Sequence, residues 1–237
     1  MKLIGHIFGS SLGKKYVMAI SGCVLFLFVV GHLVGNLQVF LGPESINRYG
    51  HFLQSNLEVI WPARLVLLLM VGLHIWSAIR LSLENRSARP VPYGDYQPAG
   101  ASYASRTMMW SGVIVLAFIV YHLMHYTLVI SAINGTGKDF MSRPEFFDSE
   151  GRHDIFRMLV VGFSNPWVSG FYILAMGLLC LHLSHGISAM VQSLGLTLPA
   201  YRRTVEFAAG LVAGLIFLGY ASIPTAILLG FGKEALK

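Results

Sequence analysis

The sequence predicts an all-α integral membrane protein, a single bundle of five transmembrane helices. Of the 237 residues, 55% are hydrophobic and only 12% are charged, about half the charged share of an ordinary soluble domain. The apolar residues fall in five stretches of roughly 20 or more residues, each long enough to cross the ~30 Å of a bilayer's hydrocarbon. The whole chain, 1–237, is therefore expected to form one membrane domain.

The five stretches alternate with polar connections that carry helix-breaking residues. Glycine and proline follow the first two stretches, glycines follow the third, and Pro199 precedes the fifth. The first stretch follows basic residues, but it is too long for a signal-peptide core and has no small-residue cleavage pattern. The expected spans are 16–41, 62–83, 107–133, 166–194 and 205–231.

The charges between the spans predict which side of the membrane each end faces. With the N-terminus inside, nine Lys and Arg residues lie on the inner side and eight on the outer side, while the acidic residues number three and eight. The inner face is then +6 and the outer face neutral. Positive charge favours the cytoplasmic side, so we expect a cytoplasmic N-terminus and an outer C-terminus. Basic residues at helix ends are typical of membrane proteins and of contact with anionic lipid, so nucleic-acid binding is not expected.

Histidines inside the apolar stretches carry the predicted chemistry. Ionisable residues at membrane depth are costly, and they are usually held inside a bundle and tied to a function. A single such histidine is as often a hydrogen-bonded structural group, but here four separate spans carry at least one. These residues are His32, His74, His122, His125 and His182, with His185 just beyond the last of them.

Depth sorts four of these histidines into two pairs. Consecutive spans run in opposite directions, and a helix rises ~1.5 Å per residue. By this count His32 and His122 occupy the outer half of the membrane, and His74 and His182 occupy the inner half. Two neutral imidazoles that face each other across a bundle can be the two axial ligands of a haem iron. With both axial positions filled oxygen cannot bind, so the pattern predicts one-electron transfer by two haems.

The histidines lie in four motifs in order along the chain: GKKYVMAISGCVLFLFVVGHLVGNLQVF followed by INRY, then GLHIWSAIRL, VYHLMHYTL and CLHLSHGISAMVQSLG. Together these motifs resemble the cytochrome b subunit of type B succinate:quinone oxidoreductases and fumarate reductases, the five-helix di-haem anchor of the cytochrome b558 family. The resemblance implies two haems b. Their axial ligands would be His32 and His122 for the outer, distal haem and His74 and His182 for the inner, proximal haem.

The resemblance also implies a function. The chain would be the membrane anchor and electron-transfer subunit of succinate dehydrogenase (complex II), in a bacterial cytoplasmic membrane. Electrons would pass from an iron–sulfur subunit through two haems b to a membrane quinone, with menaquinone expected. The chain has no glycine-rich nucleotide fingerprint and no cysteine cluster for an iron–sulfur centre. Succinate oxidation would therefore belong to a flavoprotein partner, and the quinone reaction to this chain.

Two further groups of residues are assigned by type and by position near the membrane surface, although each could equally be an ordinary interfacial polar group. A quinone site needs an apolar slot with a few hydrogen-bonding groups. The resemblance implies a site near the distal haem, beside the loop after the first span, where the candidates are His51, Gln54, Glu58 and Arg64. The candidates for holding haem propionates are Lys15, Ser21, Arg80 and Arg106.

Two departures from the simplest pattern leave alternatives open. His125 and His185 each lie three residues after an assigned ligand, on nearly the same helical face, so either could replace its neighbour; the motif spacing favours His122 and His182. Fumarate-reducing relatives carry a proton-transferring glutamate two residues before the fourth ligand. Cys180 stands there in this chain, and an apolar thiol is a poor proton carrier, which favours succinate oxidation.

Other functions are compatible with the same histidines. A proton-coupled transporter could use them as a relay, but the spans show neither the breaks nor the inverted repeats typical of transporters. A structural anchor of the same complex could have the same fold without haem. The segment 134–165, with nine charged residues, is expected to be an interfacial loop or a short amphipathic helix that covers the distal end.

Overall fold

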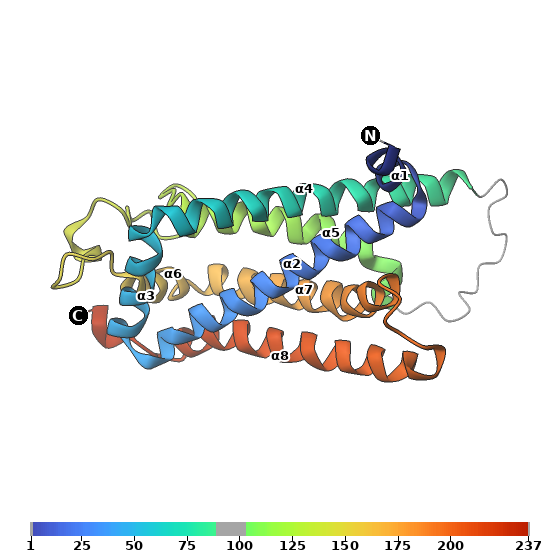
Figure 1. Ribbon diagram of the computed structural model, residues 1–237. Coiled ribbons are helices and arrows are strands. Elements are labelled where there is room, and N and C mark those ends of the chain that lie inside the picture. The colour runs from blue at the N-terminus through green and yellow to red at the C-terminus, as the bar shows by residue number, and fades with distance from the viewer. Residues whose placement is uncertain (1, 89–102, 237) are drawn as a thin grey trace.

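Long helices that run along one axis form the body of the protein in the computed structural model (Figure 1). The structure describes residues 2–88 and 103–236, apart from the side chains of 2–4, 6, 103–106 and 235–236. Five helices in these residues are long and apolar enough to cross a membrane. The described residues contain no strand, only an isolated β-bridge between Phe147 and His153. The predicted all-α, five-span fold is confirmed.

The five spans lie where the sequence predicts them, but their first and last residues differ from the expected ones. The five are α2 (Ser11–Leu37) with η1 (Gln38–Leu41), α4 (Leu57–Ser87), α5 (Tyr103–His122) with the π-helical turn η2 (Leu123–Thr127), α7 (Pro166–Ser193) and α8 (Arg202–Leu228). The shorter helices are α1 (Lys2–Gly9), α3 (Pro43–Ser55) and α6 (Ile155–Phe163), with 3-10 turns η3 (Pro144–Phe146), η4 (Pro199–Tyr201) and η5 (Lys233–Leu236).

The third span ends earlier than its apolar residues suggest. Its helix was expected to reach residue 133, but it stops at Thr127, and Val129 then takes a positive φ of 52°, which is rare for a β-branched residue. Val129 is buried in a small core with Phe140, Phe146 and Met158. The apolar residues after Thr127 therefore belong to the core of the following segment. Hydropathy alone does not distinguish such core residues from residues of a membrane span.

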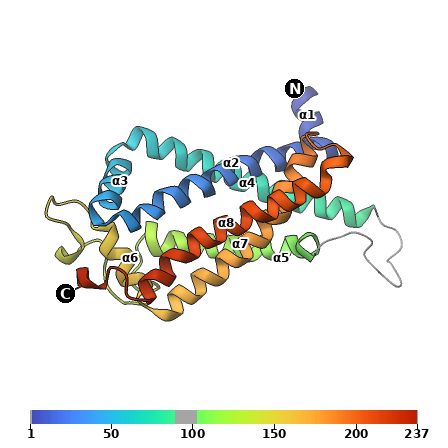
Figure 2. The same ribbon diagram turned by 90° about the horizontal axis from the view of Figure 1, so that it is seen from below.

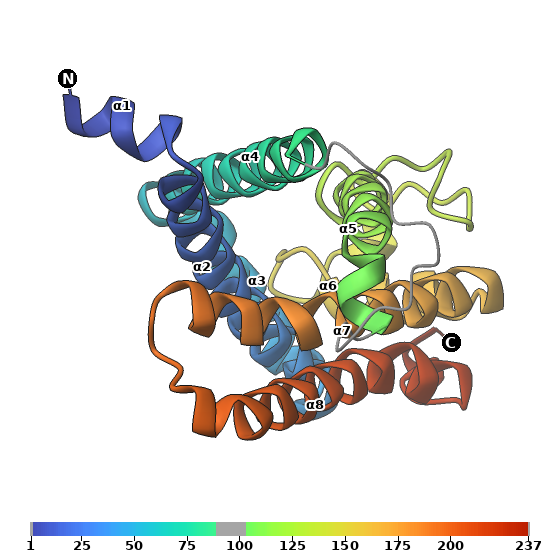
Figure 3. The ribbon, with the colours of Figure 1, turned by 90° about the vertical axis from the view of Figure 1, so that its right-hand side faces the viewer.

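Four of the spans form a ring when the bundle is viewed along its axis (Figure 3). Helix α2 packs against α4 and α7, and α7 packs against α5. The order around the ring is α4, α2, α7, α5, and α4 and α5 are not among the closely packed pairs of the described helices. Helix α8 lies outside the ring, against α7 and α2. Helices α2 and α5 are therefore diagonal partners, as are α4 and α7.

The two ends of the bundle carry different segments (Figures 1 and 2). Helix α1, with the N-terminus, and the connection from α7 to α8 lie at one end, which we call the α1 end. Helices α3 and α6, with the C-terminus, lie at the other, the α6 end. The opposite placement of the termini is what five spans require.

The segment between α5 and α7 folds back into the bundle at the α6 end. Its helix α6 has seven buried residues out of nine, so it is a core helix and not the interfacial amphipathic helix that was one of the expectations. Asp154 caps the helix by accepting a hydrogen bond from the backbone N–H of Arg157. Close packing against α3 depends on Gly50, where an added Cβ would overlap the side chain of Ile155.

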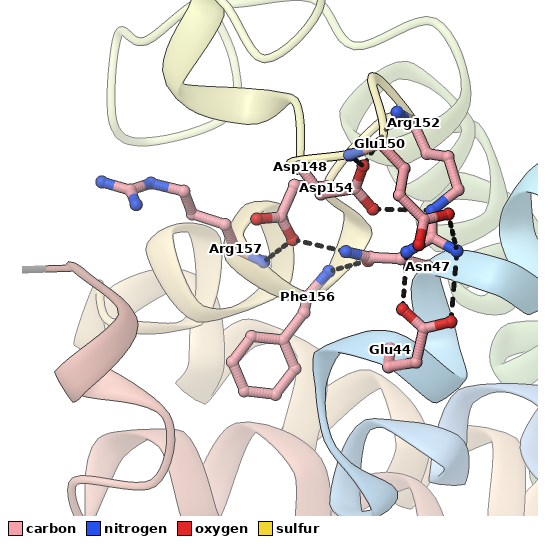
Figure 4. Close-up of polar contacts among 8 residues, drawn as sticks. All are labelled: Glu44, Asn47, Asp148, Glu150, Arg152, Asp154, Phe156 and Arg157. Atoms are coloured by element: carbon pink, nitrogen blue, oxygen red, sulfur yellow. Dashed lines mark hydrogen bonds and ion pairs between the residues drawn. The ribbon is translucent and has the colours of Figure 1, made fainter.

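A polar cluster ties this segment to α3 (Figure 4). The Arg152 guanidinium forms ion pairs with Glu44 at 2.6 Å, Asp148 at 2.7 Å and Glu150 at 3.1 Å. Hydrogen bonds from Arg152 lower the pKa of Glu44. Partial burial would raise the pKa of Asp148, but hydrogen bonds from Arg152 and from backbone N–H groups outweigh it, and the net shift is downward. Both carboxylates therefore stay ionised at neutral pH.

A buried asparagine makes a second connection between the same elements. Asn47 of α3 is only 2% exposed. Its amide nitrogen donates to Asp154 Oδ1 at 3.0 Å, and its amide oxygen accepts from the backbone N–H of Phe156 at 3.0 Å. This side chain holds the start of α6 against α3, so the α6 end of the bundle is closed by specific hydrogen bonds as well as by apolar packing.

Candidate haem-binding site

One pair of histidines faces across the α2–α5 diagonal of the ring. The rings of His32 and His122 have centroids 5.7 Å apart, and their planes lie at 80°. A phenylalanine one turn before each histidine stacks on its ring: Phe28 on His32 at 5.3 Å and Phe118 on His122 at 5.9 Å. The sequence prediction paired these two histidines at one depth, and the structure places them next to each other.

The second pair faces across the other diagonal, from α4 to α7. The rings of His74 and His182 have centroids 6.3 Å apart, with planes at 66°. The two histidines are part-buried. The four predicted ligands thus come from the four helices of the ring, and each diagonal carries one pair.

The spacing in both pairs suits one metal ion between two imidazoles. Two metal–nitrogen bonds of about 2 Å, with about 1 Å from each nitrogen to its ring centre, put the two centroids roughly 6 Å apart. In the described part of the chain no group of three or more His, Cys, Asp or Glu residues could hold a bare metal ion. A metal between these rings would need its other donors from outside the protein, which is what a macrocycle supplies.

Serine hydroxyls lie beside the second pair. Ser21 Oγ of α2 is 3.4 Å from His74 Nδ1, and Ser111 Oγ of α5 is 3.3 Å from His182 Nδ1. Ser21 was assigned to a propionate from its position, and Ser111 was missed. A signal was present in the sequence, because each serine begins a Ser-Gly dipeptide near the start of its expected span, five residues after residue 16 for Ser21 and four after residue 107 for Ser111.

A tyrosine and an asparagine lie beside the first pair. Tyr172 of α7, 6% exposed, has its hydroxyl 3.4 Å from His122 Nδ1 and 3.0 Å from His125 Nδ1. The amide nitrogen of Asn36 lies 3.3 Å from each ring nitrogen of His32. Sequence reasoning missed Tyr172, because a tyrosine in an apolar span is indistinguishable from a core residue.

The two alternative histidines do not face an imidazole across the ring, although His125 contacts the same Tyr172 hydroxyl as His122. His125 is fully buried and stacks on Tyr126, with centroids 3.9 Å apart. Within the described residues it makes no ring contact with His32. His185 is part-buried, and the described residues include no ring contact between it and His74. The structure therefore brings His122 beside His32 and His182 beside His74.

The predicted quinone residues do not form one site. All four are exposed along α3 and the start of α4, and Arg64 lies over the ring of Trp61 at 5.3 Å. A groove of about 360 Å³ lies at the same end of the bundle, and none of the four lines it. The residues that line the groove are Gln38, Ser45, Arg48, Tyr49 and Phe52.

The predicted propionate residues are likewise spread out. Lys15 and Arg80 are exposed, and the side chain of Arg106 is outside the described residues. The neighbouring Lys14 is the buried cation: it is 2% exposed and pairs with Glu84 at 2.6 Å. This ion pair joins α2 to α4 at the α1 end, so the helices that carry Ser21 and His74 are held together there.

One comparison with known proteins gives a match. Residues 16–91 match the family of the succinate dehydrogenase/fumarate reductase transmembrane subunit. The matched segment, about a third of the chain, runs from α2 through α4 and contains His32 and His74. No curated protein and no solved structure matches the chain. The match shows that residues 16–91 are similar to the transmembrane subunit of succinate dehydrogenase/fumarate reductase.

Proposed function

We propose that this chain is the di-haem cytochrome b anchor of a succinate dehydrogenase, passing electrons from an iron–sulfur subunit to a membrane quinone. The observation that carries the proposal is the pair of facing imidazoles on each diagonal of the ring, 5.7 Å and 6.3 Å between centroids. The family match of residues 16–91 supports the same complex.

The four histidines have defined roles in this proposal. His32 and His122 hold the outer haem, and His74 and His182 hold the inner haem, each through one ring nitrogen. A haem with two imidazole ligands supplies one-electron transfer and has no open position for oxygen. The ring of helices shields the four imidazoles, which are all part-buried, and places their nitrogens where they could serve as ligands.

The partners follow from the two ends of the bundle. We place the α1 end on the cytoplasmic side of a bacterial membrane, where the basic face receives an iron–sulfur subunit and, through it, a flavoprotein that oxidises succinate. The α6 end lies on the outer side. The enzymatic contribution of this chain is the quinone reaction, with menaquinone as the expected acceptor.

The groove at the α6 end is the proposed quinone site. It combines an aromatic wall, Tyr49 and Phe52, with the guanidinium of Arg48 and the amide of Gln38, whose oxygen accepts from the Ser45 hydroxyl at 3.1 Å. Ligand sites of this kind pair an apolar body with a few polar groups that fix orientation. A quinone head group has two carbonyl oxygens that accept hydrogen bonds, and the guanidinium is the strongest donor in the groove.

A difference spectrum tests the proposal. The protein is purified with its partners, and the dithionite-reduced minus oxidised spectrum is recorded with haem counted per chain. Two haems b per chain are expected. A protein without haem would contradict the proposal. If the flavoprotein and iron–sulfur subunits were still attached, the chain would be a structural anchor. If they were absent, a transporter would be the better-supported function.

A further inference from the structure

We propose that Ser21 and Ser111 are positioning residues for the inner haem. Their hydroxyl oxygens accept the Nδ1 hydrogens of His74 and His182, and each Nε2 is thereby left free to bind iron. The inference rests on the proposed function, and it extends the site from the four ligands to a matched pair of groups behind two of them.

The two serines occupy equivalent places in the ring. Ser21 comes from α2, which packs beside α4 and its His74; Ser111 comes from α5, which packs beside α7 and its His182. Both are buried, with exposures of 1% and 4%. Each inner imidazole is therefore held from the side by an adjacent helix, while it faces its partner across the diagonal.

The hydrogen bonds within each helix give the direction of the contact. A serine has one hydroxyl hydrogen to donate and two lone pairs to accept with. Ser21 Oγ lies 2.7 Å from the carbonyl of Val17, and Ser111 Oγ lies 3.1 Å from the carbonyl of Met108. Both contacts are shorter than the contact of the same oxygen to the imidazole. The single hydrogen therefore goes to the carbonyl, and the hydroxyl oxygen can only accept from Nδ1–H.

The tautomer of each inner histidine follows. A neutral imidazole carries one hydrogen, and with that hydrogen at Nδ1 the lone pair of Nε2 is free. The contacts of Ser21 and Ser111 are both made at Nδ1, and the backbone carbonyl of Met18, 3.1 Å from Ser21 Oγ, is a second acceptor for the His74 ring. In metal sites the ligand tautomer is commonly fixed by a hydrogen bond at the other ring nitrogen. The serines supply that bond here.

Glycines next to the serines bring each ring onto the neighbouring helix. A Cβ added at Gly22 would lie 3.4 Å from His74 Cε1, and one added at Gly112 would lie 3.4 Å from His182 Cε1. The imidazoles thus lie directly on helix backbone, as small residues permit in membrane bundles. In each Ser-Gly dipeptide the hydroxyl contacts the ring nitrogen, and the glycine lies within van der Waals range of the same ring.

The outer pair has no such matched arrangement. His122 faces the hydroxyl of Tyr172, and His32 faces the amide of Asn36 on its own helix. A hydrogen-bond acceptor behind an imidazole raises its basicity as a ligand. Loss of the acceptor makes the imidazole a weaker donor to ferric iron, so the reduced form becomes relatively more favourable. The serines therefore set the potential of the inner haem and leave the outer haem unaffected.

The test uses Ser21→Ala and Ser111→Ala in the intact complex, with the outer haem as an internal reference. Each variant should keep two haems, and the midpoint potential of the inner haem alone should shift upward. At a fixed ambient potential the ratio of reduced to oxidised inner haem should rise roughly threefold for each lost hydrogen bond. The low-field signal of the ferric inner haem in electron paramagnetic resonance, which reports the angle between the imidazole planes, should shift or broaden. Ser21→Thr and Ser111→Thr should stay close to the parent.

The matched control is Ser77→Ala. Ser77 is also fully buried beside His74, but its hydroxyl donates to the backbone carbonyl of His74 at 3.0 Å and not to the ring, so its loss should leave the potential unchanged. Unchanged potential and resonance in both alanine variants, with two haems bound, would overturn the inference and leave the proposed function standing. A parent protein without haem would overturn both. The alanine variants could also lose the inner haem. In that case, threonine variants that keep the inner haem would support the role of the hydroxyl. Threonine variants that lose it as well would assign the loss to packing and overturn the inference.

Discussion

Each of the four facing histidines makes a side-chain contact with a polar group and also faces a second imidazole. Neutral imidazoles in lipid need hydrogen-bond partners, because an unsatisfied polar group is costly there. Ser21, Ser111, Tyr172 and Asn36 provide such groups on one side of each ring. The sequence predicted the four histidines and their pairing by depth. It could not rank these partners, because serine, tyrosine and asparagine in apolar spans are also common packing residues.

Removal of one ligand should affect one haem only. His74→Ala or His182→Ala should abolish the inner haem and retain the outer one, and His32→Ala or His122→Ala should do the reverse, since each iron depends on its own diagonal. Haem content and the two spectral components of the purified complex measure this. His185→Ala serves as the control and should retain both haems. Loss of both haems from every ligand variant would point to a folding effect instead.

Arginine at the groove should matter for the quinone. Arg48→Ala should raise the KM for quinone roughly tenfold, the effect of losing one hydrogen bond to a charged donor, because Arg48 lines the groove at the α6 end. Steady-state quinone reduction by the complex measures it. Arg64, which lies over Trp61 away from the groove lining, provides the comparison: Arg64→Ala should leave KM unchanged. If Arg64→Ala raised the KM and Arg48→Ala did not, the quinone site would lie at the residues that were predicted from the sequence.

At the scale of helices, apolar runs predicted where the spans lie, and local contacts decided where they end. Span α7 begins at the expected Pro166, because the Asn165 side chain caps its first N–H groups. Span α5 stops at Thr127, because the following apolar residues pack with Phe140 and Phe146. Burial of α6 depends on partners more than a hundred residues away, such as Asn47. Hydropathy along the chain carries no information on such contacts.

The junction between α3 and the segment before α6 should weaken in acid. The Arg152 hydrogen bonds lower the pKa of Glu44, so the ion pair stabilises the fold above the ordinary carboxyl pKa, and this contribution disappears as pH falls through the lowered value. Thermal midpoints of the parent and of Glu44→Gln should therefore differ at pH 7 and converge only as pH falls below the ordinary carboxyl pKa of 4.5 and through the lowered pKa of Glu44. A difference that stays constant over this range would show that the ionised carboxylate is not what stabilises the junction.

At the scale of the whole molecule, an odd number of spans places the two termini, which lie at the α1 and α6 ends, on opposite sides of the membrane. Single-cysteine variants test the proposed orientation, with Cys23 and Cys180 replaced by serine. Ser142→Cys, on the exposed surface of the α6 end, should react with a membrane-impermeant maleimide in intact spheroplasts. Leu196→Cys, 73% exposed between α7 and α8, should react only after lysis. The opposite pattern would reverse the orientation.

The sequence predicted five spans but not their order around the ring. Adjacent spans in the chain do not all pack together: α4 and α5 follow each other, yet they are not among the closely packed pairs of the described helices. Which histidine faces which was predicted from depth and from the family resemblance, and depth by itself leaves the diagonals open. Backbone packing between distant spans, such as α2 with α7, decides the arrangement.

The α4–α5 side of the ring, which lacks close helix packing, has a consequence for the assembly of the protein. Three sides are held by helix packing, and the fourth is not among the closely packed pairs of the described helices. On the proposed function, that side would offer a flat macrocycle lateral entry from the lipid. Haem held on both diagonals would then tie α5 to α2 and α4 to α7, so a shortage of haem should leave newly made chains more open to proteolysis.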